Sequence, residues 1–211
     1  MVLAVCAAPA LGAQQVEYRS PAGVEYRAPA GDTTAIAAAR AALAAEPRSV
    51  AKVVALAQAQ SAARRFREAI ATLGDAMRWA PDDVLLHRWR GHRRITVRDL
   101  AGARADLERG LALDGTNYGV LFHLGVSRYL DGRFDEAAAL FARAQPLAPD
   151  GGERAGSTDW RWLSLARAGR RADGDAMLAT RPDTLPAPPG YAYVKRLAMY
   201  RGETPPERLL G

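Results

Sequence analysis

Small, large and turn-forming residues recur along this chain in three segments of 34 residues each, namely 50–83, 84–117 and 118–151. In each segment two small residues precede one large apolar residue, and a small residue and then a proline or glycine follow. This order predicts two antiparallel helices per unit, because small residues let helix backbones approach and proline ends a helix. The matched positions are Ala57, Gly91 and Gly125; Ala69, Ala103 and Ala137; Leu73, Leu107 and Phe141; Ala76, Gly110 and Ala144; and Pro81, Gly115 and Pro149.

The same pattern predicts further helices on both sides of the three units. Residues 33–48 match only the second helix of a unit, so they predict a half-repeat at the N-terminal end. Downstream, we expect a loop at Gly151–Ser157, a degenerate fourth hairpin within 157–181 and a capping helix with a tail at 190–211, since repeat arrays need covered ends. The expected helices of the full units are 50–62, 66–79, 84–96, 100–112, 118–130 and 134–145.

The N-terminal residues 1–13 are almost wholly apolar and end in small residues, which is typical of a secretory signal peptide. We therefore expect export to the periplasm or cell envelope, with a flexible apolar tail on a cytoplasmic protein as the alternative. The run is too short to span a bilayer, which takes about 20 residues. No later run reaches that length, so the sequence predicts no transmembrane segment.

Residues 14–32 contain a tandem octapeptide, Val16–Gly23 followed by Val24–Gly31. Its prolines and glycines exclude a continuous helix. Each copy opens with Val-Glu-Tyr-Arg, which alternates as a short strand does, but no partner strand is evident. We therefore expect an extended linker. The alternative is a recognition peptide that lies in the groove of its own or another copy of the chain.

The three units resemble the tetratricopeptide repeat family, because small, large and proline positions recur together in register. The resemblance implies an all-α fold, a right-handed α-solenoid of helix–turn–helix repeats with capping helices. It also implies binding of a protein or peptide along the concave face of the first helices. The sequence departs from the family where an early aromatic residue is usual, since Val53, His87 and Leu121 stand there, and where Gly115 replaces proline.

The C-terminal part of the chain carries a second resemblance. Trp160–Leu163, Ala168–Arg170 and Tyr200–Gly202 are similar to segments of bacterial cell-envelope tetratricopeptide proteins of the NlpI lipoprotein type. That resemblance implies an adaptor in the bacterial cell envelope, although the chain lacks the lipid-attachment motif.

Composition and charge narrow the chemistry. The chain has 29 Lys and Arg against 23 Asp and Glu, a net charge of +6, so acidic partners are possible. One cysteine, Cys6, excludes an intramolecular disulfide and a cysteine-based metal site. His87 and His92 are five residues apart and face different directions on a helix, so no metal site is expected. Basic side chains are concentrated in the second unit, namely Arg88, Arg90, His92, Arg93, Arg94 and Arg98.

No phosphate-binding loop, nucleophile elbow or catalytic cluster is present in the sequence, so we expect a non-enzymatic adaptor or scaffold without cofactors. We expect Arg88 and His92 to meet an acidic group or C-terminal carboxylate, with Phe122 and Tyr129 adding apolar contact. Polyanion or nucleic-acid binding through the Arg-rich second repeat is an alternative, and a structural subunit of a larger assembly is another. The predicted groove residues are Val54, Gln58, Ser61, Arg88, His92, Ile95, Phe122, Val126 and Tyr129.

Overall fold

The computed structural model describes residues 15–29, 33–180 and 191–209, so the predicted signal peptide at 1–13 lies outside the described residues. The described part is helical apart from one β-hairpin and the connecting turns. In chain order the elements are β1 (Val16–Arg19), β2 (Glu25–Arg27), α1 (Thr34–Ala45), α2 (Val50–Ala62), α3 (Phe66–Ala76), α4 (Val84–Thr96), α5 (Leu100–Leu113), α6 (Tyr118–Leu130), α7 (Phe134–Ala144), the short 3-10 helix η1 (Gln145–Leu147), α8 (Gly151–Arg167), α9 (Arg171–Ala179), α10 (Ala192–Tyr200) and η2 (Pro206–Leu209).

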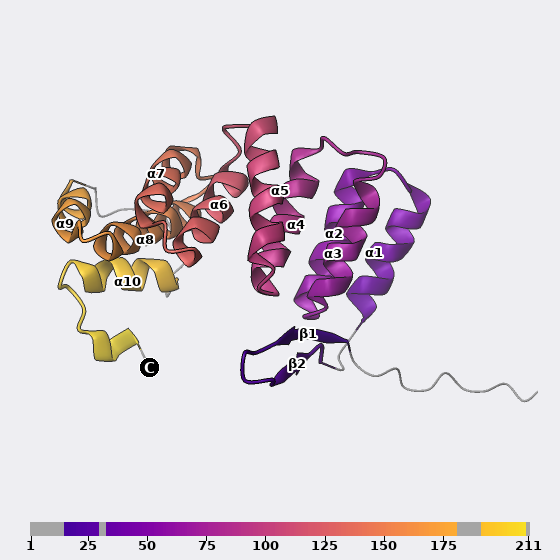
Figure 1. Cartoon of the computed structure of the whole chain (residues 1–211), viewed down its shortest axis with the longest axis horizontal. Coiled ribbons are helices and arrows are strands. Elements are labelled where there is room, and N and C mark those ends of the chain that lie inside the picture. Colours follow the sequence, from indigo (N-terminus) through magenta and orange to yellow (C-terminus); the bar gives the residue numbers. More distant parts are fainter. Residues whose placement is uncertain (1–14, 30–32, 181–190, 210–211) are drawn as a thin grey trace, which may run out of the picture.

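Four antiparallel helix pairs, α2–α3, α4–α5, α6–α7 and α8–α9, stack in chain order (Figure 1). The second helix of each pair packs on the first helix of the next, as α3 does on α4 and α7 does on α8. The single helix α1 lies against α2 at one end of the stack, and α10 lies against α8 at the other. The array is therefore an α-solenoid with a covering helix at each end, as the sequence predicts.

Glycine at the matched small positions lets the two helices of a pair approach closely. A Cβ atom on Gly91 would lie 2.7 Å from Cγ of Leu107, and one on Gly125 would lie 2.8 Å from Cζ of Phe141. Carbon atoms pack at about 3.5–4.0 Å, so a larger side chain at either position would push the pair apart.

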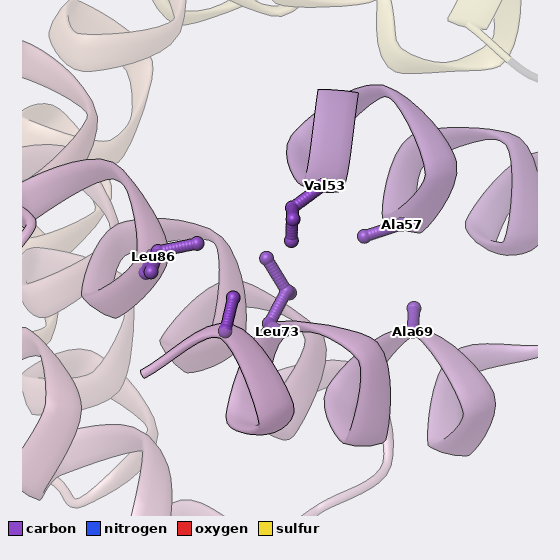
Figure 2. Close-up of a cluster of buried hydrophobic side chains, with 6 residues drawn as sticks. Val53, Ala57, Ala69, Leu73 and Leu86 are labelled. Carbon is purple, nitrogen blue, oxygen red and sulfur yellow. The ribbon is translucent and has the colours of Figure 1, made fainter. Parts of the chain in front are cut away.

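The first pair uses alanine at these positions and buries an aliphatic cluster. Figure 2 shows Val53 and Ala57 of α2 facing Leu73 and Ala69 of α3, with Leu86 of α4 beside them. All five are buried, and Leu73 and Leu86 have no exposed surface. Burying a leucine side chain contributes about 1.5–3 kcal/mol, so this cluster holds the first pair to the second.

The stack curves with one set of helices on its inner side. The first helices of the pairs, α2, α4, α6 and α8, each contact the next first helix, whereas the second helices hardly meet one another within the described residues. Helices on the concave side of a curved array lie closer together than those on the convex side. We call the first helices the inner helices and the second helices the outer helices.

The N-terminal octapeptides form a β-hairpin, so the predicted extended linker is wrong for this segment. β1 pairs with β2 in antiparallel register, with a bulge between Val16 and Tyr18, and the turn places Gly23 at a φ of +81°. The first octapeptide supplies one strand and the second supplies its partner. Each copy is thus the partner strand of the other, which the prediction of an extended linker without a partner strand did not include.

The predicted loop at Gly151–Ser157 is also wrong, because α8 begins at Gly151. The side chain of Asp150 caps this helix by accepting the backbone N–H of Glu153 at 2.8 Å. A Cβ atom on Gly152 would lie 3.1 Å from the Tyr191 ring, so glycine makes room there for the segment that leads into α10. Tertiary packing thus overrides the low helix propensity of glycine in this segment.

The C-terminal helix α10 is fixed to α8 by charge and by ring stacking. The guanidinium of Arg196 donates two hydrogen bonds, of 2.9 and 2.7 Å, to the fully buried carboxylate of Asp159. The rings of Trp162 and Tyr200 stack with 3.8 Å between their centroids. These contacts make α10 an integral cap of the last pair.

Candidate functional site

The nine predicted groove residues all lie on the inner helices α2, α4 and α6, but with unequal exposure. On α2, Gln58 is exposed, whereas Val54 packs against the first aliphatic cluster. The Ser61 hydroxyl donates to the backbone oxygen of Ala57 at 2.6 Å, so its hydrogen bond is made within α2. The α2 part of the predicted groove therefore offers one exposed polar side chain, that of Gln58.

Half-buried side chains on α4 face α6 at the centre of the inner side. The guanidinium of Arg88 lies over the indole of Trp89, with 3.6 Å from Cζ to the ring centroid. It also occupies space beside Gly119 of α6, where a Cβ atom would lie 2.4 Å from Nε of Arg88. Burial, with a contribution from nearby Arg93, lowers the pKa of Arg88 to about 10. Arg88 therefore remains charged at pH 7 in a site that is largely screened from water.

Two histidine rings in close, tilted contact lie next to this guanidinium. The rings of His92 and His123 are 3.9 Å apart at their centroids, and Nδ1 of His123 donates to the backbone oxygen of Gly119 at 2.6 Å. Burial lowers the pKa of both rings, that of His123 to about 3, and the neighbouring guanidiniums lower it further. Both histidines are therefore neutral at pH 7, so in the predicted carboxylate contact His92 would act as a neutral hydrogen-bond donor.

The second positive charge of the site belongs to Arg93, which the predicted groove omits. One of its terminal nitrogens donates to the His92 ring at 2.6 Å, and its Nε is buried without a hydrogen-bond partner. Burial lowers the pKa of Arg93 as well. Neither Arg88 nor Arg93 forms an ion pair with any residue that the structure describes. We call Arg88, Arg93 and the neutral pair His92 and His123 the basic cluster.

The other arginines of the second unit have different roles. Arg90 donates two hydrogen bonds, of 2.8 and 2.6 Å, to the buried carboxylate of Asp106 on α5, and Arg94 donates a third of 2.9 Å. These arginines therefore hold α4 against α5. Arg98 is exposed in the turn after α4. The arginines that are neighbours in the sequence thus do not form one continuous basic surface.

The aromatic residues of α6 are also divided between core and surface. Phe122 is 8% exposed and packs edge-on against Phe141, with 5.6 Å between ring centroids. Tyr129 is half-buried, and its ring lies edge-on to Trp160 of α8 at 5.2 Å. Phe122 therefore belongs mainly to the core, whereas Tyr129 and the half-buried Val126 retain accessible surface.

A tyrosine and a glutamate border the basic cluster on the α8 side. The Tyr118 hydroxyl donates to Oε2 of Glu153 at 2.8 Å, and the Ser157 hydroxyl donates to Tyr118 at 3.2 Å. Burial raises the pKa of Tyr118. The charge of Glu153 opposes the lowering of the Arg88 pKa, but the Glu153 carboxylate already accepts the hydrogen bond from Tyr118.

The described residues place no three histidine, cysteine, aspartate or glutamate side chains together as metal ligands. None of the helices in the described ranges has the length and apolar character needed to cross a bilayer. What the inner side offers chemically is two unpaired guanidiniums beside neutral rings.

Stacked helix pairs with close inner helices, small residues at the pair contacts and a capping helix define an α-solenoid of the tetratricopeptide type. Solved structures of this type are similar to the chain. Two crystal structures of MamA match with 17% sequence identity over 80% of this chain, with TM-scores of 0.57 and 0.58, and cover 81% and 87% of the MamA chains. The crystal structure of YrrB, described as a tetratricopeptide protein with an unusual peptide-binding site, matches with 19% identity and a TM-score of 0.54.

The YrrB match covers 68% of this chain and 73% of that one. At these identities the likeness shows the fold, and the site has to be argued from this chain's own residues. No protein-family model and no curated protein matches the sequence. The resemblance to envelope proteins of the NlpI type receives no support from these comparisons.

Proposed function

We propose that this chain is a non-enzymatic scaffold that binds a protein or peptide on the inner side of α4 and α6. The likeness to tetratricopeptide structures supports an interaction role, and a described peptide-binding site in YrrB is consistent with a peptide as ligand. The apolar run at 1–13 supports a location in the periplasm or cell envelope. The scaffold would hold its partner in that compartment.

The observation that carries the proposal is the pair of unpaired guanidiniums, Arg88 and Arg93. A buried charge is costly unless it is paired, so a ligand that brings an anion gains more here than at an exposed site. The planar fork of arginine suits a carboxylate, which can accept two parallel hydrogen bonds. The favoured ligand class is therefore a segment with an acidic side chain or a C-terminal carboxylate.

Apolar contacts would extend the site along α6. Val126 and Tyr129 retain surface one and two helical turns beyond Phe122, on the same side of the helix. The indole ring of Trp89 packs against the guanidinium of Arg88 in a cation–π contact. Aromatic and arginine side chains are the usual energetic centres of binding surfaces. A ligand with its carboxylate at Arg88 and an apolar side chain at Tyr129 would use both.

Binding can be tested with a library of paired peptides that differ only in a free or an amidated C-terminus. We expect wild-type protein to retain peptides with a free carboxylate or an internal acidic residue, and Arg88→Gln/Arg93→Gln to lose at least ten-fold in affinity. Arg109→Gln is the matched control, because Arg109 lies on the outer helix α5 in an exposed pair with Asp82. Equal retention of acidic and amidated peptides by wild type would refute the proposed ligand class.

Two further measurements address the alternatives. Polyanion binding loses affinity steeply with salt, roughly in proportion to the number of phosphates contacted. We expect no such binding to duplex DNA or polyphosphate, since Arg90 and Arg94 are held by Asp106. N-terminal sequencing of the mature protein tests export, and we expect the apolar run at 1–13 to be absent. Protein with an intact Met1 in the cytoplasmic fraction would contradict the proposed location.

A further inference from the structure

The first octapeptide occupies a site that the helix array does not complete by itself. The outer helix α3 begins at Phe66, and its N-cap residue Arg65 makes no side-chain capping bond. Instead, Glu17 of β1 reaches the helix: its Oε2 accepts the backbone N–H of Arg67 at 2.7 Å. The guanidinium of Arg67 in turn donates to the backbone oxygen of Glu17 at 3.0 Å. A carboxylate at this place caps free N–H groups and complements the helix dipole.

The bulge in the hairpin explains how Glu17 reaches the helix. The register shift lies between Val16 and Tyr18, so Glu17 is the extra residue and turns away from the regular alternation. Its side chain is 5% exposed, and Oε1 is buried without a hydrogen-bond partner. Figure 1 shows the hairpin below the ends of α2 and α3. Glu17 is thus the main polar anchor of the hairpin on the array.

The second octapeptide repeats the residues that make this anchor. Val24–Arg27 has the same sequence as Val16–Arg19, Val-Glu-Tyr-Arg. In this structure its glutamate, Glu25, pairs with Arg19 and Arg27 on the hairpin surface, and Tyr26 is 56% exposed. The chain therefore carries two copies of one ligand sequence and one of them is in use.

We propose that the N-terminus of α3 is a docking site for a glutamate-bearing strand, and that Val16–Arg19 and Val24–Arg27 are interchangeable occupants of it. When the second copy replaces the first, Glu25 takes the place of Glu17, eight residues further along the chain, and α3 stays capped. The first octapeptide, Val16–Gly23, is then released from the array. The device would let this glutamate-bearing octapeptide extend toward a partner while α3 keeps its cap.

The geometry allows the exchange within one chain. Arg40 of α1 pairs with Glu68 in the first turn of α3 at 3.1 Å, so α1 lies beside the docking site. Thr34, where α1 begins, is about 9 Å from Arg40 along the helix. The nine residues from Glu25 to Thr34 span up to about 30 Å when extended, about three times the length of α1 between Thr34 and Arg40.

The site is selective for α3 among the outer helices. The third unit repeats the start of α3 with Arg133 and Phe134, but Asp135 stands where Arg67 does in the first. Asp135 would repel a docking glutamate, and it already pairs with Arg170 at 3.1 Å. In the second unit Asp99 caps α5 with its own side chain. At α9 the second helical residue is Ala172, and Asp173 in the first turn pairs with Arg170. Among the outer helices that the structure describes, an arriving glutamate therefore finds an arginine at the second helical position only at α3.

The exchange can be tested on the full chain by hydrogen exchange at the amide of Arg67, the group that donates its hydrogen bond to the capping carboxylate. We expect Glu25→Ala, the matched control, to leave this amide as protected as in wild type. Glu17→Ala should raise its exchange by no more than about three-fold, because Glu25 takes over. Glu17→Ala/Glu25→Ala should raise it at least ten-fold, while amides in the core of α6 stay unchanged.

Two outcomes overturn the proposal. If Glu17→Ala alone exchanges as fast as the double variant, the second copy is not an occupant. If the double variant stays protected, a glutamate is not the cap. As a second probe, a synthetic Val-Glu-Tyr-Arg-Ala-Pro-Ala-Gly peptide should restore protection to the double variant, and its Glu→Ala analogue should not. Protection of Glu17→Ala that depends on protein concentration would assign the occupant to another copy of the chain and also reject the intrachain exchange.

Discussion

The second and third helix pairs share one backbone plan but fill three matched interior positions with opposite chemistry. In the third pair these positions hold leucines that are at most 8% exposed. In the second pair a buried aspartate, 3% exposed, binds two arginines there, with a histidine beside it. The pairs of positions, 34 residues apart, are His87 and Leu121, Arg90 and Leu124, and Asp106 and Leu140.

The comparison shows that the array needs filled volume at these positions rather than apolar surface. A buried ion pair returns little net stability, because desolvation of both charges offsets their attraction. It does restrict how α4 can lie against α5, because Arg90 and Arg94 bind Asp106 through three hydrogen bonds that each require a particular geometry. Leucines pack without such a requirement. We infer that the two helices of the second pair, of which α4 carries Arg88 and Arg93, are held more rigidly in register.

Removing the acid of the buried cluster should have the largest effect. Asp106→Ala leaves Arg90 without its carboxylate in the interior, and we expect a loss of about 3–5 kcal/mol in the free energy of unfolding. Urea denaturation measures this loss. Asp75→Ala is the control, since Asp75 pairs with Arg78 on the surface and its loss should change stability by less than about 0.5 kcal/mol. Equal effects of the two substitutions would contradict a buried cluster.

Converting the second pair to the chemistry of the third should reverse that loss. The triple variant His87→Leu/Arg90→Leu/Asp106→Leu removes the charges together, and we expect it to be as stable as wild type or more stable by about 1–4 kcal/mol. Arg94 keeps Asp99 as a partner at 3.4 Å in this variant. Thermal unfolding compares the triple variant with Asp106→Ala. A triple variant that melts below Asp106→Ala would show that the ion cluster itself stabilises the pair.

The histidine contact between the two pairs should make stability depend on pH. The pKa of His123 is about 3 in the folded chain and near 6.5 when unfolded, so the unfolded state takes up a proton first as pH falls. Stability is therefore complete above about pH 6.5 and declines toward pH 3, by about 2 kcal/mol at pH 5 for this group. His123→Gln should remove that part of the decline. Parallel curves for the variant and wild type between pH 7.5 and 5 would rule out a buried neutral His123.

The turns inside the two pairs give the smallest predicted effect. Arg98 in the second pair and Gly132 in the third occupy matched positions with φ values of 64° and 77°. A side chain at such φ costs about 1–2 kcal/mol, so Arg98→Gly should stabilise and Gly132→Arg should destabilise by about that amount. Urea midpoints of the two single variants measure this. Changes of the same sign in both would contradict equivalent turns.

Much of the fold could be predicted because the information for it is local. The inner helices α2, α4 and α6 have the same bounds as the predicted helices 50–62, 84–96 and 118–130. Proline, glycine and small residues mark these helices within each unit. The hairpin and the start of α8 were missed because distant contacts determine them: Arg67 anchors the hairpin, and the Tyr191 ring at the start of α10 packs on Gly152 of α8.

The site could be predicted only in outline. Periodicity placed Arg88 and His92 on the inner side of α4, but burial, which neutralises His92, is a tertiary property. The sequence shows Arg93 among the basic residues of the second unit. Only the structure shows that Arg93 lacks an acidic partner there, whereas Asp106 binds Arg90. The duplicated octapeptide, by contrast, was visible in the sequence, and its docking at Arg67 needed coordinates.

The helix α10 determines how this array can change in length over evolution. It packs on α8, beside which the first helix of a further repeat would also have to lie, and Arg196 secures it to a buried Asp159. A duplicated unit appended after residue 180 would have to displace α10, which would leave the buried carboxylate of Asp159 without its arginine partner. Growth by duplication is therefore confined to the middle of the array, and relatives of different length should share their last pair and its terminal helix.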